Sequence, residues 1–250
     1  MKKILLVFCL VLILSSCSND SSENDSNPLI KEVRVTTNSS PLVFKYFYNG
    51  NKITSIQIGN SLFNQYEYEG DLIVSLFNYQ NGDLSLEVHY EYDSHNRLIK
   101  ETSTEFNEGS SDMRTYTYNA DNTITRLCYN SLLASPSNLY LTSKIYLDTS
   151  GKFFKVENLM ASNWVTNLEV TYTNIKGPLK NIIGFDKLIL FSDIKIGFDT
   201  YTDYYDTGSI NHSSIFEYTV NSNNYPTQRT QTLTNSDGSI ALSNYEFIYY

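Results

Sequence analysis

The sequence is poor in the residues that most often carry metal binding, covalent cross-linking and nucleic-acid contact. Its 250 residues hold three cysteines and three histidines, with no Cys-x-x-Cys pair and no His-x-x-x-His zinc helix. So few cysteines exclude a disulfide scaffold. Lys and Arg number 18 against 27 Asp and Glu, a net charge of −9 that leaves no electrostatic footprint for nucleic acid. We expect no metal, no cofactor and no nucleic-acid partner.

Motifs for nucleophilic catalysis and phosphate binding are missing as well. The chain has no Gly-x-Ser-x-Gly elbow and no Gly-rich phosphate loop. His89, His95 and His212 have no neighbour at triad or ligand spacing, and we interpret all three as exposed. A glycosidase needs only two carboxylates about 5–10 Å apart, but most acids here alternate outward on strands or lie in turns, as solubility alone requires. We predict that the protein is not an enzyme.

Long apolar runs are absent after the first sixteen residues. Lys2 and Lys3 precede eleven apolar residues, Ile4 to Leu14. This run is about 16 Å long as a helix, too short for a hydrocarbon core of about 30 Å, so it predicts a secretory signal peptide over residues 1–16. Leu14-Ser15-Ser16-Cys17 resembles a bacterial lipobox. The resemblance implies cleavage before Cys17 and its acylation, which anchors the protein to the lipid bilayer; the alternative is an ordinary secreted protein.

The segment that follows Cys17 carries no apolar side chain. Residues 18–28 include three acids and one proline, so we predict a flexible tether over residues 17–29. Acids after the lipidated cysteine resemble the surface-export signals of Bacteroidota lipoproteins. The resemblance implies an outer-membrane lipoprotein displayed at the cell surface. Loss of residues 1–16 removes two lysines, which leaves 16 Lys and Arg against 27 acids and a net charge of −11.

The remainder of the chain shows the two-residue period of β-strands. The run Leu84–Tyr92 alternates apolar and polar residues, which places its apolar side chains on one face. Asn49-Gly50, Asn81-Gly82 and Asp237-Gly238 are typical of tight hairpin turns. Cys128 lies in a strand-like run, and we interpret it as a small core residue.

A degenerate repeat joins an aromatic pair, a polar turn and an apolar return strand. Its clearest copies are Tyr46-Phe47-Tyr48-Asn49-Gly50, Tyr66-Glu67-Tyr68-Glu69-Gly70, Tyr90-Glu91-Tyr92-Asp93 and Tyr116-Thr117-Tyr118-Asn119. The two rings of each pair share a face, so neighbouring hairpins would stack an aromatic ladder. The repeat resembles the YD-repeat hairpins of Rhs-type proteins. It is more similar to short YD-like lipoproteins of Bacteroidota, a family of largely unassigned function, over residues 42–250. The repeats are too few to enclose a cargo and no toxin tail follows, so toxin delivery is not implied.

These patterns predict an all-β fold in a single domain over residues 30–250. We expect an antiparallel array of roughly seven β-hairpins, as an open twisted sheet, a sandwich or a partial barrel. Residues 178–198 are apolar-rich without clean alternation, and we expect a short irregular or helical cap there.

Most of the candidate ligand-binding residues lie in the stretch Asp199–Asp206, which holds three acids and three tyrosines. Aromatic faces stack on sugar rings and carboxylates accept their hydroxyl groups, so the stretch predicts a glycan contact; a calcium site is disfavoured because the spacing does not match Asp-x-Asp-x-Asp-Gly. The alternative is an ordinary strand with tyrosines on the sheet and acids in water. Trp164 is a further anchor if it is exposed and a core residue if it is not. The candidates are Trp164, Asp199, Tyr201, Asp203, Tyr204, Tyr205 and Asp206.

Two functions from different classes fit this sequence. The first is a non-enzymatic lipoprotein of the cell envelope, at the outer membrane, that binds an extracellular glycan or protein through an aromatic-rich sheet. The second is a structural or assembly lipoprotein that pairs strands with a partner. A glycan hydrolase is the third and least supported hypothesis.

Overall fold

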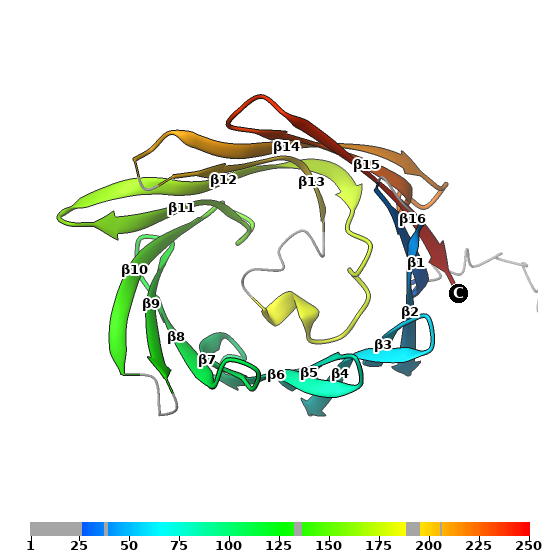
Figure 1. Ribbon diagram of the computed structural model, residues 1–250, viewed down its shortest axis with the longest axis horizontal. Coiled ribbons are helices and arrows are strands. Elements are labelled where there is room, and N and C mark those ends of the chain that lie inside the picture. The colour runs from blue at the N-terminus through cyan, green and yellow to red at the C-terminus, as the bar shows by residue number, and fades with distance from the viewer. Residues whose placement is uncertain (1–26, 38–39, 133–136, 189–195, 206) are drawn as a thin grey trace, which may run out of the picture.

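The computed structural model describes residues 27–37, 40–132, 137–188, 196–205 and 207–250. In these residues sixteen antiparallel strands close into one barrel, in which chain neighbours pair and β16 pairs with β1 (Figure 1). The first eight strands are β1 (Ile30–Thr36), β2 (Leu42–Asn49), β3 (Lys52–Ile58), β4 (Ser61–Glu69), β5 (Leu72–Gln80), β6 (Asp83–Tyr92), β7 (Leu98–Glu105) and β8 (Ser110–Tyr118). The others are β9 (Thr123–Leu132), β10 (Asn138–Leu147), β11 (Phe153–Met160), β12 (Asn163–Lys176), β13 (Ile196–Tyr204), β14 (Ile210–Val220), β15 (Pro226–Asn235) and β16 (Ile240–Tyr249).

The all-β antiparallel prediction is confirmed, but the expected array of about seven hairpins is wrong. The sheet is neither open nor sandwiched, because its first and last strands pair over Ile30–Thr36. Register shifts recur next to the β2–β3, β4–β5 and β6–β7 turns, which lie at the same end of the barrel. They fall between Phe47 and Tyr48, Glu67 and Tyr68, and Glu91 and Tyr92. Such bulges bend a strand and increase its twist, which favours closure.

The turns have the backbone conformation that the sequence indicates. Asn81 and Gly82 both adopt positive φ, at 55° and 94°, between β5 and β6. Two consecutive positive φ values match the right-handed twist of the flanking strands.

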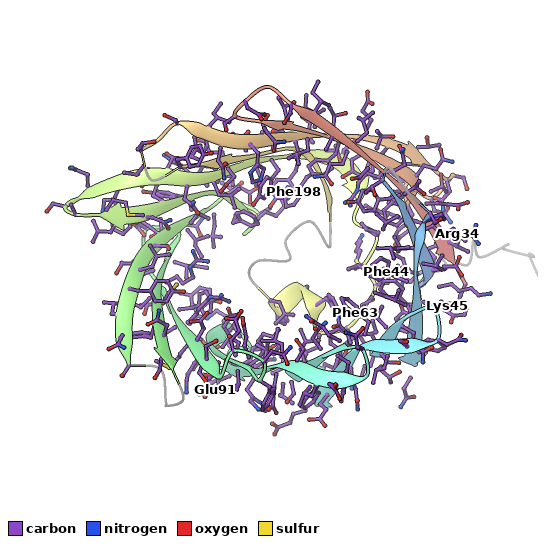
Figure 2. All side chains as sticks on the ribbon, viewed as in Figure 1. Arg34, Phe44, Lys45, Phe63, Glu91 and Phe198 are labelled. Atoms are coloured by element: carbon purple, nitrogen blue, oxygen red, sulfur yellow. The ribbon has the colours of Figure 1, made fainter. Side chains whose placement is uncertain are left out.

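The buried apolar side chains of the strands point into the barrel. Phe44, Phe63 and Phe198 point into the lumen, while Lys45 and Glu91 point away from it (Figure 2). Most of the buried apolar residues form one cluster, which comprises Ile53, Ile56, Ile73, Val88, Tyr90, Leu98, Tyr116, Ile124, Ile145, Phe153, Val156, Val170, Ile182, Phe185 and Leu188. The core of this protein is therefore the inside of its barrel.

The repeated aromatic pairs also point inward, and their second tyrosines join neighbouring hairpins. Each of six donates its hydroxyl to a carbonyl oxygen near the start of the preceding return strand. The pairs are Tyr48 to Ile30 (2.8 Å), Tyr92 to Ile73 (2.7 Å), Tyr118 to Leu98 (3.1 Å), Tyr172 to Phe153 (2.7 Å), Tyr218 to Phe198 (2.9 Å) and Tyr249 to Pro226 (2.8 Å). We call these contacts the tyrosine clasps. They give the repeat a physical role, because each unit is bonded to the unit before it.

The segment after β12 enters the lumen instead of capping the sheet. Residues 177–188, with the short 3-10 helix η1 (Phe185–Lys187), lie inside the ring of strands (Figure 1). Ile183 N–H donates to the carbonyl of Asn51, and Tyr68 donates its hydroxyl to the carbonyl of Ile183. We call residues 177–188 the plug, and the barrel end that carries the β2–β3 and β4–β5 turns the plugged end. Of the remainder of the predicted cap, residues 189–195 lie outside the described residues and 196–198 belong to β13.

One plug residue must be glycine. Gly184 has φ 86°, and a Cβ there would lie 2.9 Å from the carbonyl oxygen of Asp71 and 3.1 Å from Ile73. The plug thus passes close to the β4–β5 turn, where no larger side chain fits without a shift.

Candidate ligand site in the barrel lumen

The predicted acidic and aromatic stretch divides between the two faces of the wall. Tyr201 and Asp203 point into the lumen from β13, where Tyr201 stacks on His212 with ring centroids 6.0 Å apart. Asp199 accepts from Thr171 on the outer face, and Tyr204 donates to Glu169 there.

Tyr205 follows β13 in an exposed turn, and Asp206 lies outside the described residues. The stretch therefore does not form one site, because successive residues of a strand point to opposite faces.

The other residues singled out in the sequence also have defined places. Trp164 is 44% exposed on the outer wall, so it is not a core residue. His89 is exposed as expected, whereas His212 lies in the lumen with its Nδ1 3.5 Å from Asp203. Cys128 is 2% exposed, which confirms that it is a small core residue.

The lumen changes character along its axis. At the plugged end the tyrosines and the plug fill it with apolar side chains. Toward the opposite end, which carries the β3–β4 and β5–β6 turns, the inward positions on β7 and β8 are polar. Glu101, Ser103 and Glu105 occupy them on β7, and Asp112 and Arg114 on β8. We call this end the open end.

A half-open cavity of about 260 Å³ lies where the two parts of the lumen meet. One side is apolar and includes Leu188, the last described residue of the plug. The adjoining polar part is formed by the inward side chains of β7 and β8, which follow β6 in the wall. The lining residues are Leu76, Leu86, Val88, Tyr90, Glu101, Ser103, Glu105, Asp112, Arg114 and Leu188. An apolar cavity with a few converging polar groups is the usual form of a small-molecule site.

The electrostatics of this cavity start from one ion pair. Arg114 donates to the carboxylate of Glu101, whose side chain is 12% exposed. Burial lowers the pKa of the Arg114 guanidinium, but the hydrogen bond and the charge of Glu101 outweigh it, and the pKa is raised overall. Burial also raises the pKa of Tyr90, so its hydroxyl stays neutral. The positive charge of Arg114, the arginine that lines this cavity, is thus already balanced by Glu101.

Buried polar groups continue from this ion pair into the plugged half of the lumen. Arg126 donates to the hydroxyl of Ser143 over 3.0 Å, and Ser143 donates to Asn158 over 2.8 Å. The Tyr116 hydroxyl and Arg126 Nε are buried without a hydrogen-bond partner among the described residues. No group of three or more His, Cys, Asp or Glu residues in the described ranges could hold a metal ion.

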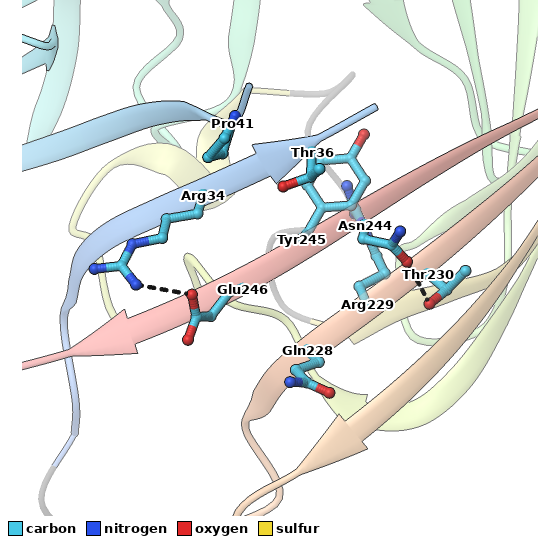
Figure 3. A pocket seen from close by; sticks show the side chains of 9 residues that line it. All are labelled: Arg34, Thr36, Pro41, Gln228, Arg229, Thr230, Asn244, Tyr245 and Glu246. Carbon is cyan, nitrogen blue, oxygen red and sulfur yellow. Dashed lines mark hydrogen bonds and ion pairs between the residues drawn. The ribbon is translucent and has the colours of Figure 1, made fainter. Parts of the chain in front are cut away.

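A second hollow, of about 520 Å³, lies on the wall formed by β1, β15 and β16 (Figure 3). Arg34 there pairs with Glu246 over 3.1 Å, and Thr230 donates to Asn244 over 3.0 Å. Most of its lining side chains are polar, and Pro41 and the ring of Tyr245 are its apolar surfaces. It is therefore a weaker candidate than the lumen cavity.

Sequence reasoning did not identify the cavity residues. On β7 polar residues occupy inward and outward positions alike, so alternation gives no signal for Glu101 or Glu105. Pairing of β7 with β6 places Glu105 beside Leu86 and Glu101 beside Tyr90 on the same inner wall.

The comparisons with known proteins show the fold. No protein-family model matches the chain, and no curated protein matches it. The crystal structure of a porin-like protein from Bacteroides vulgatus ATCC 8482 matches with a TM-score of 0.58 and 14% identity, over 90% of this chain and 99% of that one. A porin-like protein from Bacteroides uniformis ATCC 8492 matches with a TM-score of 0.52 and 12% identity, over 88% and 96%. In the described part of the chain no helix is long and apolar enough to cross a membrane.

Proposed function

We propose that the protein is a non-enzymatic, lipid-anchored binding protein of the outer membrane that holds a small extracellular ligand in the open half of its barrel. The observation that carries this proposal is the distribution of polarity across the wall. The apolar cluster lies inside the barrel, and the charged side chains of Arg34, Lys45 and Glu91 point away from it (Figure 2). Such a barrel suits a receptacle better than a pore.

The outer wall carries charges where a transmembrane barrel would meet lipid. Lys155 pairs with Glu157 over 2.7 Å on β11, and Arg34 pairs with Glu246 over 3.1 Å between β1 and β16. Transmembrane barrels alternate apolar outward and polar inward, and an outward Lys or Arg at the bilayer midplane costs about 2–4 kcal/mol. Here the main apolar cluster lies inside the wall, and these ion pairs lie outside it. This arrangement supports a barrel that stands in water and reaches the membrane through a tether, in spite of the likeness to porin-like proteins.

The place where the tether joins the barrel sets its orientation. β1 begins at Ile30 and β16 ends at Tyr249, and Ile30 and Tyr249 pair at the plugged end. A tether over residues 17–29 spans at most roughly 45 Å when extended. The plugged end would therefore face the bilayer, and the open end would face away from it, toward extracellular ligands.

Closure of the barrel gives the assembly alternative less support. Pairing by strand addition needs a free sheet edge, and in this barrel each strand pairs on both sides along much of its length.

Two measurements test how the barrel is attached. The Cys17→Ala variant of the full chain is expected to remain unprocessed and to incorporate no labelled fatty acid. A chain that begins at residue 18 is expected to be a monomer in water without detergent. A requirement for detergent by that chain, or ion conductance when it is added to planar bilayers, would count against the tethered receptacle.

Ligand binding in the lumen is tested with two neighbouring positions on β7. Ser103 faces the cavity, whereas Thr102 pairs with the exposed His89 on the outer wall. Ser103→Phe is expected to abolish saturable binding found in a screen of oligosaccharides and outer-membrane extracts, and Thr102→Phe to leave it unchanged. Equal binding by both variants would place the ligand outside the lumen.

A further inference from the structure

The lumen cavity carries more negative charge than its own basic group balances. Three of its lining side chains, Glu101, Glu105 and Asp112, are carboxylates, against the single guanidinium of Arg114, which leaves a formal charge of −2. Arg114 is committed to Glu101 by a direct hydrogen bond. Glu105 and Asp112 have no ion pair among the described residues.

The register of β7 and β8 holds these two free carboxylates near each other. Asp112 is directly opposite Ser103, and Glu105 is two residues further along β7 on the same face. Diagonal positions of this kind have Cα atoms about 7–8 Å apart, within reach of one small group between them. Ser103 is next to both acids on this face, and its hydroxyl can accept or donate a hydrogen bond.

The part of the cavity that adjoins these acids offers little to ligate an ion. The side chains of Leu76, Leu86, Val88 and Leu188 are hydrocarbon, and the hydroxyl of Tyr90 is the polar group among them. A hard cation such as Ca²⁺ requires six to eight oxygen ligands, which a cavity half lined with hydrocarbon does not offer. A free anion would meet two unpaired carboxylates. An ammonium group joined to an apolar body matches both sides, because its N–H groups bond to the acids while its body removes apolar surface from water.

We propose that the lumen cavity binds a small organic ammonium compound with an apolar body. The inference rests on the proposed function, since it names the ligand class of the same lumen. Asp112 and Glu105 hold the ammonium group, Ser103 accepts one of its N–H groups, and the aliphatic side chains of β5, β6 and the plug contact the body. A cavity of about 260 Å³ limits the ligand to the size of one ring with a short side chain.

Three probes with nearly the same body and different head charges test this inference: 2-phenylethylammonium, 2-phenylethanol and phenylacetate. Their binding to the full lipidated protein in a non-ionic detergent is measured by titration calorimetry, with the Ser103→Phe variant as the blank for detergent partition. The ammonium compound is expected to bind at least about tenfold more tightly than the alcohol, since a charged hydrogen bond contributes about 1.5–3 kcal/mol. Phenylacetate is expected not to bind.

The variants separate a charge effect from a folding defect. Asp112→Asn and Glu105→Gln are each expected to weaken ammonium binding about tenfold and to leave binding of the alcohol unchanged. Asp112→Glu, which retains the charge, is expected to restore most of the affinity. Glu91→Gln, on the outer wall, is the matched control and is expected to have no effect. Thermal unfolding of each variant checks that the barrel is intact.

The outcomes distinguish the ligand class from the proposed function. Equal affinity for the ammonium compound and the alcohol, unaffected by Asp112→Asn, would overturn the cation preference while binding in the lumen stands. Failure of the ammonium compound to bind would overturn the inference even if an oligosaccharide binds and Ser103→Phe abolishes that binding. If neither the ammonium compound nor any oligosaccharide binds to the protein, the inference and the proposed function are overturned together.

Discussion

The tyrosine clasps make a quantitative prediction about stability. In the clasp of Tyr92 the hydroxyl donates to the carbonyl oxygen of Ile73 over 2.7 Å, and Ile73 is fully buried. Replacement of Tyr92 by Phe keeps the ring and its packing and removes only this hydrogen bond. A net hydrogen bond contributes about 0.5–1.5 kcal/mol, and an acceptor left unpaired in the interior costs about 1–3 kcal/mol. We expect Tyr92→Phe to lower the free energy of unfolding by about 1.5 kcal/mol.

The assay is thermal and urea unfolding of the chain that begins at residue 18, followed by circular dichroism. A loss of about 1.5 kcal/mol corresponds to a fall in Tm of about 3–6 °C for a domain of this size. The control is Tyr79→Phe, because the Tyr79 hydroxyl is exposed and lies 3.4 Å from Gln65. It should change Tm by less than about 1 °C.

Combination with a second clasp sharpens the test. Tyr118 occupies the equivalent position two strands away, about 10 Å from Tyr92, so the two losses should add. Tyr92→Phe/Tyr118→Phe should therefore lose roughly 3 kcal/mol of stability. A single Tyr92→Phe variant as stable as Tyr79→Phe would refute the idea that the clasps bind one hairpin to the next.

Three further predictions follow from the plug, the buried tyrosines and the buried thiol. Gly184→Ala should destabilise the barrel by at least about 1–2 kcal/mol and increase cleavage of the plug in limited proteolysis, whereas Gly59→Ala, at φ 61° with open space around it, should show only the backbone cost. Burial raises the pKa of Tyr118 from 10 to about 12. The contribution of this neutral tyrosine to the free energy of unfolding is therefore complete below pH 10 and is lost as the pH rises toward 12. Alkaline unfolding should begin in this window, and a variant that lacks the plug contacts should unfold at a lower pH. Burial also raises the pKa of Cys128, so the thiol should react with iodoacetamide only at the rate of global unfolding; rapid alkylation of the folded protein would contradict its place in the core.

The sequence by itself determined the local structure of the barrel. Alternation predicts that Val88, Tyr90 and Tyr92 share a face, and the register of β6 places all three toward the lumen. Asn81-Gly82 predicts a tight turn, which the positive φ values confirm. Both results depend on neighbours within one or two hairpins, and such short-range preferences can be read from residue types alone.

Only the tertiary structure decided closure, the plug and the candidate site. Closure depends on twist and bulges that accumulate over sixteen strands, so no single repeat contains it. Alternation separates two faces without telling which is concave, and for that reason Tyr201 and Tyr204, close in sequence, lie on opposite sides of the wall. Asp112 and Leu188, far apart in sequence, meet in one cavity because the barrel closes around the segment that enters it.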